Sequence, residues 1–236
     1  MKNSIGIVIP AYNPNLKVLE RYVKDLEGAL HPDLIIVEID EPDERELNQL
    51  EEMSVRIEIS DTKRGKGAAI TRGFDRLESD ILVFVDADGS VPVKSVEKVC
   101  NSIGNSSIGL AVGSRRHPDS DVKSHQGNIR KLLGDGFSFI SRILLEVKLY
   151  DYQCGAKAIE RNVWKEVRDD IEREGFSWDI ELISVVSAMG HKIEEIPIEW
   201  EDQPGSTVKI IPAIIELLNA LVSVRMKVTN IKRRMK

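Results

Sequence analysis

Residues 81–92 read Ile-Leu-Val-Phe-Val-Asp-Ala-Asp-Gly-Ser-Val-Pro. The apolar run of residues 81–85 is typical of a buried strand, and two carboxylates one residue apart, Asp86 and Asp88, follow it directly. Open α/β sheets bind ligands at the carboxyl ends of their strands, and hard divalent cations bind carboxylates together with substrate phosphates. The segment therefore predicts either a metal–diphosphate site or a solvated Asp-Gly turn after a strand.

The composition of the chain is that of a folded acidic protein. Its 236 residues are 42% hydrophobic and 31% charged, which fits one large domain, or one domain with an appendage, and excludes a disordered chain. The net charge of −6 argues against a general nucleic-acid binder, so no nucleic-acid partner is expected.

Three further features bear on where the protein works. Cys100 and Cys154 are far apart and give neither a metal-ligand spacing nor a disulfide framework, so a reduced, cytosolic setting is expected. The first apolar run, residues 5–9, is too short for a signal peptide. No stretch reaches 18 apolar residues, so no transmembrane span is predicted.

Strand-like apolar runs alternate with helix-like segments through the first half of the chain. Strands are expected at 5–9, 34–39, 55–59, 81–85 and 108–112, and helices at 16–30, 44–53, 67–77 and 93–103. This alternation predicts an α/β fold with a mostly parallel sheet and helices on both faces.

The pattern changes after Gly113. A polar, structureless loop is expected at 114–128, then a long apolar helix at 129–149, a strand at 150–160, a helix at 178–189 and a strand at 193–200. A loop of this length in a compact domain is usually functional or mobile.

The end of the chain reads as a separate unit. Pro212 can open a helix, and apolar residues then recur every three or four positions up to Val222. Six Lys or Arg and no acid follow in residues 225–236. An amphipathic helix beside a basic cluster is typical of binding to an anionic membrane surface. The alternative is a helix docked on the sheet or on a second subunit.

Polar segments stand where the expected parallel strands end, and such ends gather along one rim of a sheet. They are Pro10-Ala11-Tyr12-Asn13-Pro14, Glu38 with Asp40, residues 61–67, Asp86 with Asp88, and Gly113-Ser114-Arg115-Arg116. This mixture suits a base, a ribose, a metal-bridged diphosphate and a second anion. Residues 64–69, with Lys66, lack the P-loop spacing, and predict either a phosphate contact or a tightly packed helix start.

Seven segments in order carry a resemblance to a known family. They are IGIVIPAYNP near the start, DTKRGKGAAITRGF at 61–74, ILVFVDADGS at 81–90, GSRR at 113–116, YDYQCGAKAI at 150–159, GFSWDIEL at 175–182 and IPIEWEDQPGSTV at 196–208. Together they resemble the family-2 glycosyltransferases of the GT-A fold, of the dolichyl-phosphate glucosyltransferase and dolichyl-phosphate mannose synthase kind.

The resemblance implies a GT-A catalytic domain at 1–208. Residues 209–236 are then the amphipathic helix and basic tail, for which the residue pattern predicts attachment to a membrane surface. It implies that Pro10, Tyr12, Asn13, Val37, Glu38, Asp40, Lys66, Asp86 and Ala87 bind the nucleotide sugar, that Asp86, Asp88 and Ser90 hold Mg²⁺ or Mn²⁺, and that Arg115, Arg116, Arg130 and Lys209 face the acceptor phosphate. The catalytic residues it implies are Asp86, Asp88, Arg115 and Asp179.

Two positions leave alternatives open. Relatives usually carry a base-reading Asp where this chain has Ile39, so Glu38 or Asp40 substitutes or the base is read differently. Asp179 is either a general base or an acid that favours a helix N-terminus. A lipid-phosphate acceptor is already anionic and needs cations rather than a base.

We therefore expect an inverting, metal-dependent glycosyltransferase in protein glycosylation. It would move one hexose, glucose or mannose, from a UDP- or GDP-linked sugar to a polyprenyl or dolichyl phosphate. Because the processive QxxRW motif is absent, a single transfer is expected. The protein would sit peripherally on the cytoplasmic face of the membrane.

Two alternatives remain open. Ile39 keeps a non-catalytic nucleotide-sugar binder or membrane scaffold possible. A haloacid-dehalogenase-type phosphatase would use Asp86 as a nucleophile on phosphorus. A Rossmann dehydrogenase is disfavoured because no GxGxxG follows the first strand.

Overall fold

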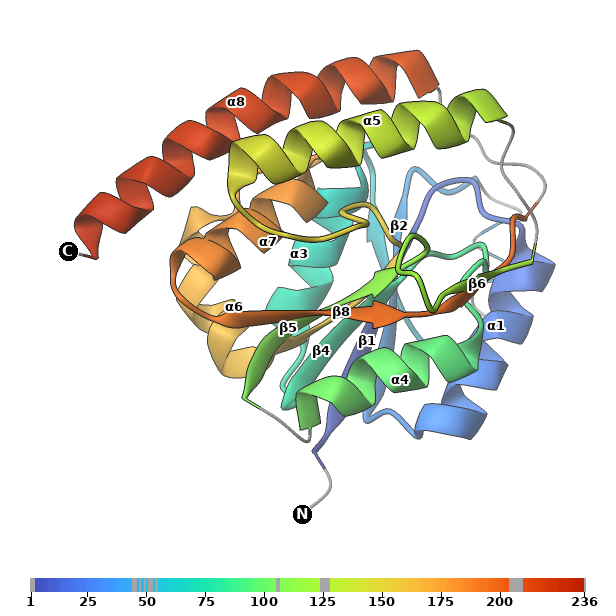
Figure 1. Cartoon of the computed structure of the whole chain (residues 1–236). Coiled ribbons are helices and arrows are strands. Elements are labelled where there is room, and N and C mark those ends of the chain that lie inside the picture. The colour runs from blue at the N-terminus through green and yellow to red at the C-terminus, as the bar shows by residue number, and fades with distance from the viewer. Residues whose placement is uncertain are drawn as a thin grey trace.

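The computed structural model describes residues 3–43, 46, 48, 50, 53, 55–104, 107–123, 128–203 and 210–235 (Figure 1). The expected helix at 44–53 and the Pro-Gly-Ser piece at 204–206 fall largely or wholly outside this part.

A seven-stranded sheet forms the centre of the fold, with strand order β3-β2-β1-β4-β7-β5-β8. Its strands are β1 (Ile5–Ala11), β2 (Leu34–Asp40), β3 (Arg56–Ser60), β4 (Ile81–Val85), β5 (Ile108–Ser114), β7 (Ala156–Glu160) and β8 (Lys192–Pro197). All neighbours pair in parallel except β7, which runs antiparallel between β4 and β5. The prediction of a mostly parallel sheet is confirmed.

Helices cover both faces of the sheet (Figure 1). They are α1 (Leu16–Leu30), α3 (Lys66–Arg76), α4 (Val93–Gly104), α5 (Asn128–Leu145), α6 (Arg161–Val167), α7 (Trp178–Ala188) and α8 (Ile210–Arg234). One core cluster joins α1 and α4 to the sheet, and a second joins α3, α6, α7 and α8 to the other face. The helices α5 and α8 run side by side outside α7 (Figure 1).

Burial explains this arrangement. In β1, Ile7 and Ile9 belong to the cluster with α1 and Val8 to the cluster with α3, so the strand is apolar on both faces, as central parallel strands are. Trp178, at the start of α7, is fully buried against the rings of Phe74, Phe84 and Trp164. The sequence therefore anchors α7 between the sheet and the outer helices.

The second half of the chain differs in detail from expectation. The expected structureless loop at 114–128 contains β6 (Asp121–Val122), which pairs with β9 (Glu199–Trp200). The expected helix at 129–149 ends at Leu145, where Glu146 takes a positive φ of 60°. The short helix α6 and the 3-10 turn Arg168–Asp170 have no counterpart among the predictions. Within the described residues, no helix combines the length and hydropathy that a bilayer crossing requires.

Gly73 tests the close packing of α3 on β1. A Cβ there would lie 2.5 Å from Cγ2 and 2.6 Å from Cγ1 of the buried Val8, and a β-branched side chain in a sheet cannot yield easily. We expect Gly73→Ala to lower the free energy of unfolding by about 1–3 kcal/mol. Urea unfolding measures this change.

Gly28 of α1 is the matched control, because a Cβ there meets nothing within 4 Å. We expect Gly28→Ala to be neutral or stabilising, by up to about 1 kcal/mol. Equal losses in the two variants would contradict the packing argument.

Candidate active site

The carboxylates Asp86 and Asp88 emerge directly after β4, at the carboxyl end of the parallel strands. The backbone N–H of Asp86 donates to the carbonyl oxygen of Gly155 at 2.9 Å. A Cβ on Gly155 would overlap the Asp86 carboxylate. The glycine before β7 therefore lets the two chain segments approach closely enough to fix Asp86.

Asp88 is the accessible acid of the pair. Its side chain is exposed, and one carboxylate oxygen accepts the N–H of Ser90 at 2.9 Å. Desolvation by the surrounding protein, and then the charge of Asp86, raise the pKa of Asp88 above its ordinary value, although the residue remains accessible to solvent. A cation would relieve this repulsion, so the donor set fits a hard divalent metal.

The two carboxylates are not a complete metal site by themselves. Among the described residues, no group of three or more His, Cys, Asp or Glu side chains could hold a metal ion. The remaining ligands would come from a bound diphosphate and water, as is usual for Mg²⁺.

A chain of alternating charges lies beneath the pair. The Nζ of Lys66, at the start of α3, lies 2.8 Å from Oδ1 of Asp86 and 3.7 Å from Oδ2 of Asp179. The Nζ of Lys157 lies 2.6 Å from Oδ1 of Asp179. Lys157 and Asp179 are each 1% exposed, so each charge depends on the other.

This row of charged side chains sets the charge state of Asp86. Burial alone would raise the pKa of Asp86, but the positive charges of Lys66, Lys157 and Arg115 outweigh burial and lower it. Asp86 is thus held as a carboxylate, beside Asp88, whose pKa is shifted the other way.

The arginines after β5 are held by a buried acid. Arg115 binds Asp151 through Nε at 2.7 Å and NH2 at 2.9 Å, and Arg116 reaches the same carboxylate at 3.1 Å. Burial would raise the pKa of Asp151, yet the two arginines lower it strongly. Asp151 therefore holds two guanidinium groups together at this corner of the rim.

The segment after β1 lies open to solvent. Tyr12 is 42% exposed, and the Nζ of Lys63 lies 3.4 Å from the centroid of its ring. Asn13 adopts a positive φ of 47°, which asparagine tolerates better than most residues. Pro10 and Ala87 are half-buried. This surface offers an aromatic face at the same rim as Asp86.

The end of β2 is arranged differently from what its sequence suggests. Glu38 and Asp40 are buried, and Arg72 of α3 binds them at 2.8 and 2.9 Å. Asp40 also accepts the backbone N–H groups of Arg64 and Gly65, which shape the start of α3. The two acids thus fix α3.

Val37 and Ile39 are fully buried in the core on the α1 side. The structure therefore gives no polar group of 37–40 that is free to meet a base.

Several functional candidates differ from those that the sequence offered. The side chain of Arg130 and the whole of Lys209 lie outside the described residues. The sequence does not predict a role at the site for four residues that the structure brings there: Lys157, Asp151, Gly155 and Arg72. Lys157 could have been found from the sequence, because a lysine inside an apolar strand is a buried charge that requires a charged partner.

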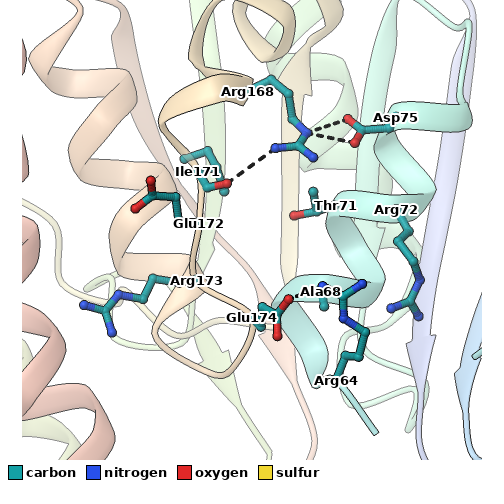
Figure 2. Close-up of a pocket in the computed structure, with 10 residues that line it drawn as sticks. All are labelled: Arg64, Ala68, Thr71, Arg72, Asp75, Arg168, Ile171, Glu172, Arg173 and Glu174. Atoms are coloured by element: carbon teal, nitrogen blue, oxygen red, sulfur yellow. Dashed lines mark hydrogen bonds and ion pairs between the residues drawn. The ribbon is translucent and has the colours of Figure 1, made fainter. Parts of the chain in front are cut away.

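A separate cavity of about 150 Å³ lies between α3 and the chain at 168–174. Figure 2 shows its charged lining residues, where Arg168 binds Asp75 and Arg64 pairs with Glu174. Neither Asp86 nor Asp88 lines this cavity. It is therefore distinct from the site at the strand ends.

The chain is similar to proteins of a known family. The family model described as Glycosyl transferase family 2 matches residues 6–168. The glycosyltransferase AglD of Haloferax volcanii is 27% identical over 222 residues, which cover 89% of this chain and 35% of AglD. The chain thus spans about a third of that relative.

Other relatives match over more of their length. The dolichyl-phosphate beta-glucosyltransferase of Saccharomyces cerevisiae is 28% identical over 248 residues, covering 94% of this chain and 74% of that protein. The crystal structure of glucosyl-3-phosphoglycerate synthase from Mycobacterium tuberculosis with Mn²⁺, UDP and phosphoglyceric acid superposes with a TM-score of 0.72 at 15% identity, over 94% of this chain and 78% of that one. At this low sequence identity, the similarity to the synthase shows a shared fold.

The pairing of Asp151 with two arginines predicts a pH-dependent stability. Asp151→Asn removes the buried charge that binds the half-buried Arg115, so we expect the free energy of unfolding to fall by about 3–5 kcal/mol at pH 7. The pKa of Asp151 is lowered by folding, so its contribution is full above about pH 4 and declines as the pH falls below it. Urea unfolding of both proteins from pH 7 to pH 3 measures the difference.

Asp121→Asn is the matched control, because Asp121 is exposed. We expect it to change the free energy of unfolding by less than about 0.5 kcal/mol. A difference for Asp151→Asn that does not shrink below pH 4 would contradict the ion-pair account.

Proposed function

Because this chain belongs to glycosyl transferase family 2, we propose that it is an inverting glycosyltransferase that moves one hexose from a nucleotide diphosphate sugar to a polyprenyl phosphate. Family membership confirms the resemblance stated from its motifs. The observation that carries the proposal is the accessible carboxylate Asp88 beside Asp86 and Lys66 at the end of β4. The family match also displaces the phosphatase alternative.

The donor side follows from the charges at that strand end. Asp88 and Asp86 would hold Mg²⁺ or Mn²⁺, which neutralises negative charge developing on the leaving diphosphate. Lys66, whose Nζ lies 2.8 Å from Asp86, would meet the same phosphates. UDP-glucose is the donor we propose, since relatives are named dolichyl-phosphate beta-glucosyltransferases and a fold neighbour was crystallised with Mn²⁺ and UDP-glucose.

The acceptor side follows from the state of Asp179. Lys157 and Lys66 hold both of its carboxylate oxygens, so it is poorly placed to accept a proton from a sugar hydroxyl. A phosphate acceptor needs no base because it is already ionised, and it needs cations. Arg115 and Arg116, which Asp151 holds together after β5, are the cations that we propose for this role.

An exposed apolar surface supports work at a membrane. On α5 and α8, which lie side by side (Figure 1), the exposed apolar side chains are Phe139, Ile140, Ile143, Leu218, Val222 and Met226. We call these six residues the outer apolar face. Exposed apolar side chains on two neighbouring helices are typical of a lipid or protein contact. It would lie against an anionic cytoplasmic leaflet, where a polyprenyl phosphate presents its head group.

The basic tail contributes less to this contact than its sequence suggests. Arg225 and Lys232 bind Glu146, Arg234 binds Asp170, and Lys227 binds Glu172 and Glu181. Much of its charge is therefore neutralised by the body of the protein. The outer apolar face is the stronger argument for membrane attachment.

A thermal-shift panel tests the donor site. With Mn²⁺ present, we compare UDP, GDP, UDP-glucose, GDP-mannose and no nucleotide, on wild type and on Asp88→Ala. UDP and UDP-glucose should stabilise the wild type by about 2.7 kcal/mol at a hundred times the dissociation constant, and Asp88→Ala should lose this shift. A preference for GDP would change the proposed donor from UDP-glucose to a GDP-linked sugar. No shift with any nucleotide would contradict the donor site.

Flotation with vesicles tests the membrane contact. Val222 is 61% exposed, and burying a valine in lipid contributes about 1.5 kcal/mol. We expect Val222→Glu to weaken binding to vesicles containing anionic lipid by about tenfold or more. Ala29→Glu, at an exposed position of α1 on the opposite face of the sheet, should leave binding unchanged. Equal binding by all three proteins would exclude the outer apolar face as the contact.

A further inference from the structure

Residues 171–177, which we call the connecting segment, lie between α8 and the start of α3. The segment lies outside the strand-end site. It connects α8, which carries part of the outer apolar face, to the start of α3, which carries Lys66. On one side the segment is bound by polar side chains of α8, and on the other its backbone touches the glycine-rich turn around Lys66.

The first link to α8 is the ion pair between half-buried Lys227 and buried Glu181. The Nζ of Lys227 contacts Glu181 at 2.7 Å, Glu172 at 2.8 Å and the carbonyl of Asp170 at 3.0 Å, which uses all three donors of an ammonium group. Glu181, 1% exposed, accepts the backbone N–H groups of Glu172 and Arg173 at 2.8 and 2.7 Å. One lysine of α8 thus fixes the beginning of the segment.

The second link lies at the end of the segment. Glu216 of α8 accepts the N–H and the hydroxyl of Ser177 at 3.1 and 2.9 Å. A Cβ on Gly175 would overlap the Glu216 carboxylate, so the segment passes directly beneath this side chain. Ser177 precedes α7, whose first turn carries Asp179.

The other side of the segment meets the active-site turn through its backbone. The N–H of Ala68 donates to the carbonyl of Glu174 at 3.0 Å. A Cβ on Gly65 would lie 2.7 Å from that same carbonyl oxygen. The position of Lys66, between these contacts, therefore depends on where the segment lies.

We propose that Lys227, Glu181 and Glu216 are positioning residues, which set the placement of Lys66 and Asp179 by holding the connecting segment against the start of α3. None of the three reaches the paired carboxylates, so they act through the segment alone. In consequence, the helix that carries part of the outer apolar face also determines how well the donor site is formed. This consequence rests on the proposed function, whereas the positioning itself does not.

The physical reason is the burial of Glu181. Removing Lys227 leaves this carboxylate without its cation, and an unpaired buried charge is unfavourable. The charge is relieved if the segment opens to admit water, which releases the carbonyl of Glu174 from Ala68. The same opening loosens the turn that places Lys66 beside Asp86.

The test compares Lys227→Met with Lys232→Met in the full chain. Both remove a lysine from α8, but Lys232 pairs with Glu146, away from the segment. We expect Lys227→Met to speed hydrogen exchange at the Ala68 amide, to weaken binding of UDP with Mn²⁺ by about tenfold, and to raise the KM for the donor without raising that for the acceptor. Lys232→Met should match wild type, and Lys227→Arg should recover most of the loss.

A second variant keeps the inference falsifiable if Lys227→Met fails to fold. Glu216→Met removes the acceptor of Ser177 at a half-buried position, and the same two changes in exchange and UDP binding are expected. A folded variant at either position with wild-type Ala68 exchange and wild-type UDP binding would overturn the proposal.

The two readouts separate this inference from the proposed function. If wild type binds no nucleotide, the proposed function fails and Ala68 exchange alone decides the positioning. If wild type binds UDP and the folded variants match it both in UDP binding and in Ala68 exchange, the proposed function stands and the positioning is wrong.

Discussion

The buried pairing of Lys157 with Asp179 is the constraint on which the rest of the site depends. Both side chains are 1% exposed, and neither charge is tolerated in the interior without the other. Because Lys157 comes from β7 and Asp179 from α7, the pair ties the antiparallel strand to the helix. Lys66 extends the pairing to the start of α3 and Asp86 extends it to the end of β4. Four elements are thus held in register by one alternating row of charges.

The same rule distinguishes structural acids from available ones. Asp151, Glu38 and Asp40 are buried and bound by arginines, so their oxygens are engaged within the protein. Asp88 is exposed, and Ser90 is the hydrogen-bond partner that the structure gives it among the described residues. An acid with free lone pairs next to a second carboxylate is what a divalent cation requires. Among the acids of the rim, Asp88 is therefore the one that we propose as a metal ligand, because its carboxylate is still available.

The last helix shows how one element can have two faces with different purposes. Its inner face packs on α5 and α7 and binds residues 171–177 through Lys227 and Glu216. Its outer side, with α5, carries the apolar residues that remain exposed. The basic run at the end, which by sequence favours an anionic surface, is largely paired with acids of the body. A helix so firmly bound packs against the body of the protein, as the docked-helix alternative of the sequence predicts.

The sequence by itself determined the parallel core and the position of Asp86 and Asp88, because strand-length apolar runs, helical periodicity and an acid pair directly after a strand are local signals. It did not determine the antiparallel insertion of β7, the pairing of β6 with β9, or the partners of the charged residues. Arg115 and Asp151 are 36 residues apart, and Lys157 and Asp179 are 22 apart. For that reason Glu38 and Asp40 looked available for a base when Arg72 in fact holds them. Periodicity is written along the chain, whereas the choice of partner for a buried charge is made only when distant segments meet in space.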